Sequence, residues 1–449
     1  AAPPSSPTAP PAAEAPRPAA TAAAPTAAAA PAATKPAAAA PAPKEAVTVR
    51  VTYRIGDKPE MYERLFPQFM QQNPNIKLVG EPVSFGAYEE YFAKLASMMA
   101  ADTLGDVVWV SAGSGPFLSQ VFKGFFLPID DLVKKANYDL KVWYPSALEA
   151  LTWEGKLYAL PSDMHPGAQF VYYNKKLFDA AGLKYPTSEW SYDDLVATAE
   201  KLTRRSGDRT EVFGISPLVA SWAQEVMARS HGGSYLTADA KKSAVKEAPA
   251  RATLEWLYDG MHKQKAIPRK QDVAKDANEM FYTEQAAMTT GLLGLVFAAP
   301  ARIGEKFKLG ATRLPKGKSG KHGGMVHIGG QAVYAKTKNP EAAFTALTFI
   351  TGLDNAVIRA LESGGTLARR DLFEHPKLAE KGGDDWKVVL EALADPNLKP
   401  YFTPNNLRTS EMQSVIDQET DAFWSGKTTV AEGIDQLDTA LNVVLAKPR

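Results

Sequence analysis

Segments with strand character alternate with segments of helical spacing over residues 46–111, and this alternation constrains the fold more than any other feature. The β-branched run AVTVRVTYRIG predicts a strand, and Met61–Gln72 has the apolar spacing of a helix. The next segments are a strand (IKLVGEPV), a helix over Tyr88–Ala101 and the continuous apolar strand DVVWVSA. Strands that alternate with helices indicate βαβ units and a mostly parallel sheet.

The pattern starts again further along the chain. We expect helices over Tyr192–Leu202, Trp222–Arg229 and Ala250–Lys263, and further helices from Met280 and from Glu341 onward. EVFGISPL and QAAMTTGLLG predict strands, and GGMVHIGGQAVYA predicts a strand pair with a glycine corner. Because 449 residues exceed the size at which one core keeps growing, we expect an α/β fold of two lobes, each with a central, mostly parallel sheet. In such sheets ligands bind outside the carboxyl ends of the strands.

The first 45 residues have a different composition from the rest of the chain. Thirty-four of them are Ala or Pro, and large apolar side chains are almost absent. Proline interrupts the alanine runs, and there is too little apolar surface to repay ordering. We interpret residues 1–45 as a disordered tether that holds a folded domain away from a surface; the alternative is a flexible tail without a role.

Bulk properties exclude several classes of protein. A formal net charge of +1 argues against a large electrostatic footprint for nucleic acid or a membrane surface. The absence of cysteine removes disulfides, thiolate metal sites and cysteine nucleophiles. No apolar run is long enough to span a membrane, and the start AAPPSSPTAP lacks the pattern of a signal peptide.

Three motifs suggest catalysis or metal binding, and each is incomplete. LPKGKSGKHGG lacks the first glycine of a phosphate-binding loop, because Thr312 stands there. His322 and His327 have no third ligand at a matching spacing, and Ser114 lacks the glycines of a G-x-S-x-G elbow. We therefore predict no catalytic residue, no metal and no cofactor.

Aromatic and polar residues near predicted strand ends are better candidates for binding a small molecule. Flat aromatic faces suit the C–H faces of sugars, and directed polar groups suit hydroxyls. For each aromatic residue alone, a place in the core is the competing interpretation. The aromatic candidates are Trp109, Tyr172, Tyr173, Trp222 and Tyr401, and the polar ones are Asp57, Ser111, Asp163 and Arg369.

Eight stretches occur in an order typical of one family: FMQQNPNIKL, YFAKLASMMAADTLGDVVWV, GFFLPIDDL, GKLYALPSDMHPGAQFVYYNKKLFDAAGL, PTSEWSYDDLVATAEKLT, AAMTTG, LPKGKSGK and GGTLARRDLF. They resemble the extracellular solute-binding proteins (family 1, sugar-type) of bacterial ABC importers, over residues 46–449. The resemblance implies a periplasmic-binding-protein-like fold of type II, with crossing segments near residues 159–166, 287–291 and 318–323. The lobes would be residues 46–160 plus 291–320, and residues 161–290 plus 321–449.

The resemblance also implies a function. Such proteins capture a small solute between two closing lobes and deliver it to the membrane permease subunits, and they are not enzymes. It further implies a monomer at the extracellular face or in the periplasm. A lipid anchor would need a cysteine that is absent from this chain, so we interpret residues 1–45 as the linker that follows such an anchor.

Compared with maltodextrin binders of that family, the chain matches at some ligand positions and departs at others. Asp57 and Lys58 match their first-strand loop, and Arg408 matches a terminal Arg-Thr pair. An Asp-Arg pair is replaced by Ala112-Gly113, and an acidic ligand residue by His165 or Asp163. At three other places, stacking or polar side chains of the maltodextrin binders are replaced in this chain, by Ser216-Pro217-Leu218, by Leu293 and by Pro404. A smaller sugar, a polyol or a ligand of another class therefore fits better than a maltodextrin.

Our hypothesis is a carbohydrate-like solute as ligand. The alternatives are a peptide, a polyamine or a phosphodiester on the same fold, a secreted carbohydrate-active enzyme, and a tethered structural protein. For His165 either ligand contact or capping of the hinge stays open, while Pro161 and Pro166 would stiffen the crossing. The expected ligand contacts are Asp57, Lys58, Trp109, Ser111, Asp163, His165, Trp222, Gly291, Gly330, Arg369 and Arg408.

Overall fold

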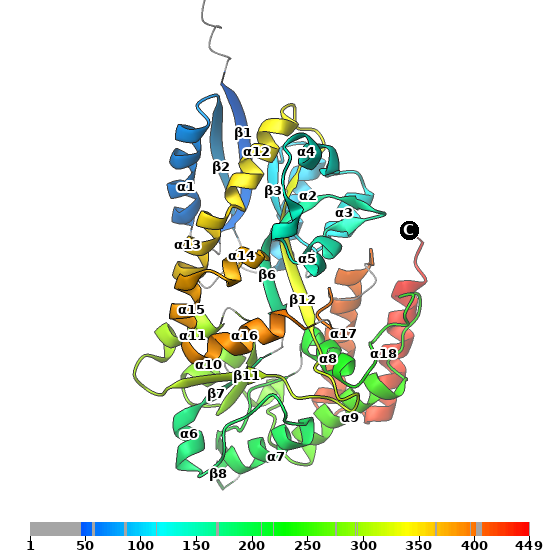
Figure 1. The fold of residues 1–449 in the computed structure, drawn as a ribbon. Coiled ribbons are helices and arrows are strands. Elements are labelled where there is room, and N and C mark those ends of the chain that lie inside the picture. Colours follow the sequence, from blue (N-terminus) through cyan, green and yellow to red (C-terminus); the bar gives the residue numbers. More distant parts are fainter. Residues whose placement is uncertain are drawn as a thin grey trace, which may run out of the picture. The chain divides into compact units, whose positions relative to one another are not determined.

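A five-stranded sheet organises the first part of the fold in the computed structural model (Figure 1). Its order is β2 (Ile76–Ser84), β1 (Val47–Ile55), β3 (Val107–Ser111), β12 (Met325–Val333) and β6 (Ala159–Gly167). β1 runs parallel to β2 and β3, through the crossover helices α1 (Pro59–Gln72) and α2 (Tyr88–Ala100). The predicted βαβ units are therefore confirmed, and the carboxyl ends of these three strands share one edge.

The structure describes residues 46–448, except 56–58, 85–87, 114, 168–169, 208, 219, 274–275, 292, 294, 364–365, 396 and 401–405. The chain divides into two units, Ala1–Lys44 and Glu45–Arg449. The tether predicted over residues 1–45 lies outside the described residues.

The second sheet is antiparallel, in contrast to our expectation of a mostly parallel one. β7 (Phe170–Asn174) lies between β10 (Met288–Gly291) and β11 (Leu309–Arg313), and both neighbours run against it. β7 is buried on both faces: Phe170 and Tyr172 pack in one hydrophobic cluster, and Val171 and Tyr173 in another. Burial on both faces explains why its sequence shows no polar alternation.

Two predicted strands were wrong in detail. GGMVHIGGQAVYA forms the single nine-residue strand β12 rather than a pair, because its glycines accommodate a register shift between Gly329 and Gly330 without ending the strand. In EVFGISPL only the start is a strand: β9 (Arg209–Val212) forms a hairpin with β8 (Arg204–Ser206). Phe213 then makes one parallel bridge to Ala286.

Strand pairing also reassigns two segments between the expected lobes. β11, in the stretch 291–320, pairs with β7 in the second sheet. β12, in the stretch 321–449, pairs with β3 and β6 in the first sheet. A division into two lobes remains our proposal, with these two segments exchanged.

Two hydrophobic clusters cover the sheets. The first cluster contains side chains of the first sheet and of one face of the second sheet. It also contains side chains of α1, α2, α3 (Phe117–Phe122), α4 (Asp130–Lys135), α5 (Pro145–Ala150), α10 (Ala277–Tyr282), α11 (Leu295–Ile303), α12 (Pro340–Ile350), α13 (Leu353–Ser363), α14 (Arg370–Phe373), α15 (Pro376–Gly382) and α16 (Trp386–Leu393). The other face of the second sheet packs with α6 (Lys175–Ala180), α7 (Tyr192–Leu202), α8 (Ser221–Ser230), α9 (Ala248–His262), α17 (Thr409–Trp424) and α18 (Val430–Leu445). Short elements complete the fold: β4 (Thr152–Trp153), β5 (Lys156–Leu157) and the 3₁₀ turns Leu140–Val142, Lys270–Asp272 and Gly383–Asp385.

Most predicted helices are confirmed, and α7 has the bounds that its sequence predicts. Ser191 is its N-cap: its side chain accepts a hydrogen bond from the Asp194 N–H, and the Asp194 carboxylate accepts one from the Ser191 N–H. Within the described ranges no single helix is long and apolar enough to cross a membrane; α12 and α13 pass that test only as a pair bent by 46°.

Candidate functional site

The carboxyl edge of the first sheet is where the chain passes to the second sheet. Gly329 of β12 pairs with Ser111 at the end of β3, so the first residues of β12 continue beyond β3 alongside β6, as far as the Met325–Gly167 pair. Phe170 begins β7 three residues after β6 ends. The chain thus crosses between the sheets directly after the stretch predicted to cross, and β12 lies beside this crossing.

A buried cluster of charged and aromatic side chains lies at this edge. Asp163 of β6 is 2% exposed, and its Oδ2 accepts hydrogen bonds from Trp109 Nε1 (2.6 Å) and Ser162 Oγ (3.3 Å). Arg359 of α13 forms an ion pair with Asp163, and Arg54 Nη2 lies 3.8 Å from the same carboxylate. The guanidinium of Arg54 also stacks 4.2 Å from the centre of the Trp109 ring. These contacts fix the crossing strand β6 to β1, β3 and α13.

Trp109 is a core residue as well as a member of this cluster. It is 1% exposed and packs against Tyr91 and Phe92. The Tyr91 hydroxyl donates to the Trp109 carbonyl over 3.0 Å, and burial raises the Tyr91 pKa. Tyr172 and Tyr173 are also buried, as the competing interpretation of the aromatic candidates predicted, whereas Tyr401 lies outside the described residues.

His327 lies beside the crossing, although its sequence context suggested it only as an incomplete metal ligand. It is half-buried, and its ring lies against Gly113, where an added Cβ would be 2.3 Å from its Cδ2. The register places it directly opposite His165 on β6, of which only the backbone is described. His327 was not predicted as a ligand contact, because the strand register that pairs it with His165 cannot be read from the spacing of residues in the sequence.

The other predicted contacts near the crossing are Ser111, Gly291 and Gly330. Ser111 is fully buried at the end of β3, and Gly291 ends β10 opposite Phe170. A Cβ on Gly330 would meet Leu151 and Ala159 at 3.1 Å, so Gly330 packs against the core.

Three predicted residues lie against other partners. Arg369 is buried, binds Asp371, donates to the Thr351 carbonyl and lies 5.1 Å from the Trp143 ring centre. Trp222 is half-buried in the first turn of α8 and packs against the second cluster. Arg408 pairs with Glu411. Asp57 and Lys58 lie outside the described residues.

A second connection between the sheets lies after α16. Asp395 forms an ion pair with Arg313 of β11, and the Lys399 carbonyl accepts a hydrogen bond from the Val326 N–H of β12 over 2.8 Å. Burial alone would raise the Asp395 pKa, but hydrogen bonds from Arg313 and from the Asn397 N–H outweigh it and lower the pKa. Asp395 and Lys399 therefore tie β11 to β12.

The crossing expected near residues 318–323 forms a turn against α8. Lys318 N–H donates to His231 Nδ1 over 3.1 Å, and Ser319 Oγ donates to the Ser230 carbonyl. Arg229 of α8 donates to the Gly324 carbonyl at the start of β12, over 2.9 Å. Cavities of about 340, 470 and 480 Å³ adjoin this region and the segment 395–400.

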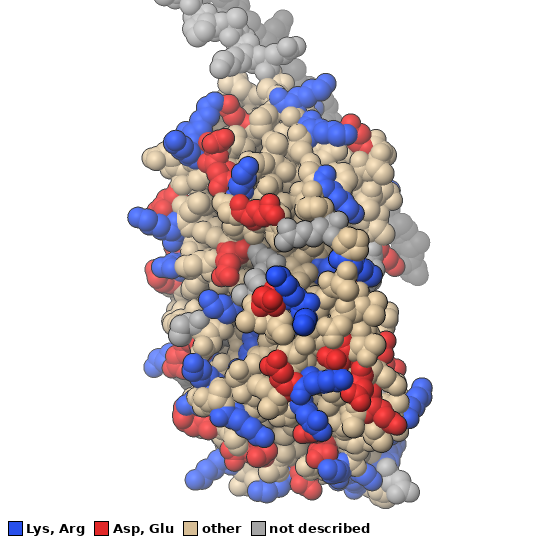
Figure 2. Space-filling view, turned by 90° about the vertical axis from the view of Figure 1, so that its right-hand side faces the viewer, with Lys and Arg blue, Asp and Glu red and all other residues tan. Residues whose placement is uncertain are grey.

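Metal ligands are not gathered anywhere in the part of the chain that the structure describes: no three His, Asp or Glu side chains group closely enough to hold an ion. Charge is also mixed on the face shown in Figure 2, where basic and acidic side chains are interspersed. This mixing agrees with the net charge of +1.

Comparison with known proteins gives one family. The family model described as bacterial extracellular solute-binding protein matches residues 56–357. An uncharacterized ABC transporter extracellular-binding protein of Pyrococcus horikoshii is 32% identical over 173 residues, which cover 36% of this chain and 38% of that protein.

Two solved structures share the fold. An ABC substrate-binding protein of Listeria monocytogenes in complex with cycloalternan has a TM-score of 0.75 at 20% identity, over 89% of this chain and 99% of the other. UgpB of Mycobacterium tuberculosis in complex with glycerophosphocholine has a TM-score of 0.76 at 19% identity, over 88% and 98%.

Proposed function

Because the chain belongs to the family of bacterial extracellular solute-binding proteins, we propose that it captures a small solute between two closing lobes and delivers it to the permease of an ABC importer. Ligand that bridges both lobes favours the closed state, and the permease recognises that state. Residues 1–45 serve as the tether, through a lipid-bearing cysteine outside this chain. The protein acts as a monomer, without catalysis and without binding nucleic acid.

The observation that carries this proposal is the way in which the two sheets are joined. β6 continues into β7 after two residues, and β12 lies beside β6 up to the same point. A few backbone positions at such a crossing can absorb the rotation of one lobe against the other. The carboxyl ends of β1 and β3 meet this crossing, where open sheets bind ligands.

A carbohydrate-like solute is the proposed ligand, either a small sugar or a polyol. The support is the fold shared with the cycloalternan complex and the departures from the maltodextrin pattern. A phosphodiester is the second candidate, because the fold is equally shared with a glycerophosphocholine complex and because two guanidinium groups, Arg54 and Arg359, lie at the carboxyl edge beside one carboxylate, Asp163.

We divide the expected contacts by role. Asp57, Lys58, His165 and Gly291 are proposed to touch the solute, with His327 added from the strand register. Three residues, Trp109, Ser111 and Asp163, are proposed to support them from within the sheet, since each is at most 2% exposed. Contributions to the site from Trp222, Gly330, Arg369 and Arg408 are also proposed, although their described contacts are with other residues.

A thermal-shift screen tests the proposal. The full chain is heated with millimolar sugars, polyols, glycerophosphodiesters, polyamines and peptides. A micromolar ligand, worth about −8 kcal/mol, raises the melting temperature at such concentrations. A sugar or polyol that raises it supports the first candidate, and a glycerophosphodiester alone supports the second. Turnover of a glycoside by the chain would overturn the transport role.

A further inference from the structure

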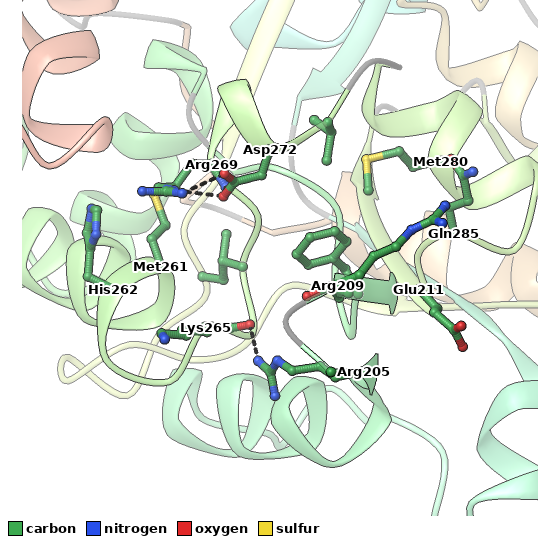
Figure 3. Close-up of a pocket in the computed structure, with 15 residues that line it drawn as sticks. Arg205, Arg209, Glu211, Met261, His262, Lys265, Arg269, Asp272, Met280 and Gln285 are labelled. Carbon is green, nitrogen blue, oxygen red and sulfur yellow. Dashed lines mark hydrogen bonds and ion pairs between the residues drawn. The ribbon is translucent and has the colours of Figure 1, made fainter.

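A separate cavity of about 740 Å³ is shown in Figure 3, and none of the residues that line it belongs to the first sheet. Its walls are the β8–β9 hairpin, the end of α9 with the following loop, and α10 with the residues after it. Small-molecule sites usually have volumes of about 300–1,000 Å³, so this cavity has the size of a ligand site.

The floor of the cavity is apolar. Met261, Ile267 and Met280 line it and are 4%, 1% and 2% exposed, and half-buried Phe213 adds an aromatic ring. The half-buried ring of Phe213 offers surface to the apolar body of a ligand, since burying apolar area contributes about 25 cal/mol per Å².

Basic side chains surround this floor. Arg205 donates to the Lys265 carbonyl over 2.7 Å, which joins the hairpin to the loop after α9, but a carbonyl does not neutralise the guanidinium. Within the described ranges, no carboxylate pairs with Arg205, Arg209 or Lys265, and Glu211 is the lining acid that could offset them. Figure 3 shows Arg205 and Lys265 together on one side of the cavity and Arg209 extending toward Gln285 on the other side.

The fourth cation of the cavity is already neutralised. Arg269 binds Asp272 through two parallel hydrogen bonds of 2.6 and 2.7 Å. These bonds raise the Arg269 pKa against the opposing effect of burial. The pair forms a fixed part of the rim, and the surplus positive charge comes from the hairpin and the loop.

We propose that this cavity is a second ligand site, which takes a small organic anion whose carboxylate or phosphate is carried on an apolar or aromatic body. Arg205 binds the anionic group, because a guanidinium fork matches carboxylate and phosphate oxygens, and Lys265 and Arg209 add positive charge around the cavity. The apolar floor holds the body. This site is distinct from the one proposed for the transported solute.

Phenyl phosphate is a suitable probe, and benzylamine is its cationic counterpart of similar size. Binding of each to the full chain is measured by titration calorimetry at physiological ionic strength. The test variant is Arg209→Gln/Lys265→Gln. The matched control, Arg204→Gln/Lys263→Gln, removes the same charge from exposed neighbours on the same two elements that do not line the cavity.

We expect phenyl phosphate to bind, the test variant to weaken it about tenfold and the control to change it by less than about twofold. Benzylamine is expected not to bind. An equal loss in both variants, equal binding of both probes or no binding of phenyl phosphate would overturn the proposal. Unchanged binding of phenyl phosphate to the test variant would show that the anion binds elsewhere, for example in the transport cleft. This result would also overturn the second site, but it would leave the proposed transport function intact.

Discussion

The indole N–H of Trp109 on β3 donates a 2.6 Å hydrogen bond to the buried carboxylate of Asp163 on β6. The bond joins a parallel strand of the first sheet to the strand that leads into the second sheet. Arg359 and Arg54 complete the cluster from α13 and β1. Asp163, which the sequence suggested as a ligand contact, therefore fixes the crossing strand β6 to its neighbours.

Replacing the carboxylate of Asp163 should be costly. Asp163→Asn keeps the shape but leaves the Arg359 guanidinium buried without its counter-charge, and Arg359 is only 7% exposed. We expect a loss of about 3–5 kcal/mol in the free energy of unfolding, measured by urea denaturation. Glu341→Gln breaks the exposed pair with Lys135 as a control and should cost less than about 1 kcal/mol. Equal small losses would contradict this role of the cluster.

Gly329 allows the strand β12 to approach this cluster. A Cβ there would lie 2.7 Å from Asp163 Oδ2 and 3.0 Å from the Trp109 ring. Gly329→Ala should therefore cost about 1–3 kcal/mol by overpacking. In an Asp163→Ala background part of the clash is absent, so a double-mutant cycle should give a coupling of at least about 0.5 kcal/mol. Strict additivity would show that the close approach carries no strain.

Arg229 fastens α8 to two chain segments at once. Its guanidinium donates to Glu225 (2.8 Å), to the Gly324 carbonyl (2.9 Å) and to the Pro400 carbonyl (3.0 Å). A lysine cannot serve three diverging acceptors, so Arg229→Lys should lower the free energy of unfolding by about 1–3 kcal/mol. Arg251→Lys, on an exposed pair with Glu255, is the control and should stay within about 0.5 kcal/mol. Similar values for both would refute this fastening role.

Two histidines, buried His322 and half-buried His231, predict a loss of stability in mild acid. Burial and the nearby Arg313 lower the pKa of His322, and burial and Lys318 lower that of His231. The folded state therefore favours neutral imidazoles. Their contribution to the free energy of unfolding is complete above the usual histidine pKa of about 6.5, and it is lost as the pH falls through the lowered pKa values of the folded state.

We therefore expect the urea midpoint to fall between about pH 7.5 and pH 5.5, a window above the usual carboxylate range. The variant His231→Asn/His322→Asn should show a smaller fall over the same window. Equal slopes for variant and parent would mean that other groups control the pH dependence.

The sequence predicted local elements better than their pairing. Ser191 and Asp194 specify the start of α7 through contacts within one turn, so its bounds could be read directly. The direction of β11 and the course of β12 depend on strands more than a hundred residues away, and the glycines of β12 suggested a corner where a bulge occurs. Long-range pairing has no local signal.

The site shows the same limit. Trp109 and Asp163 were both selected as ligand contacts because each lies near a strand end. Their hydrogen bond and the ion pair to Arg359 arise only when residues 54 positions and 196 positions apart meet. His327 was missed because its neighbour across the sheet, His165, lies on a strand far away in the sequence.

Closure around a solute is the central claim, and a distance measurement tests it directly. The chain has no cysteine, so spin labels can be placed at Lys123→Cys, after α3, and Lys241→Cys, before α9, which are both exposed positions. Labels at Lys94→Cys and Lys123→Cys, both beside the first sheet, provide the control pair. We predict that a solute that raises the melting temperature shifts the mean of the first distance distribution and narrows it, and leaves the control pair unchanged. An unchanged first distribution in the presence of such a solute would contradict closure.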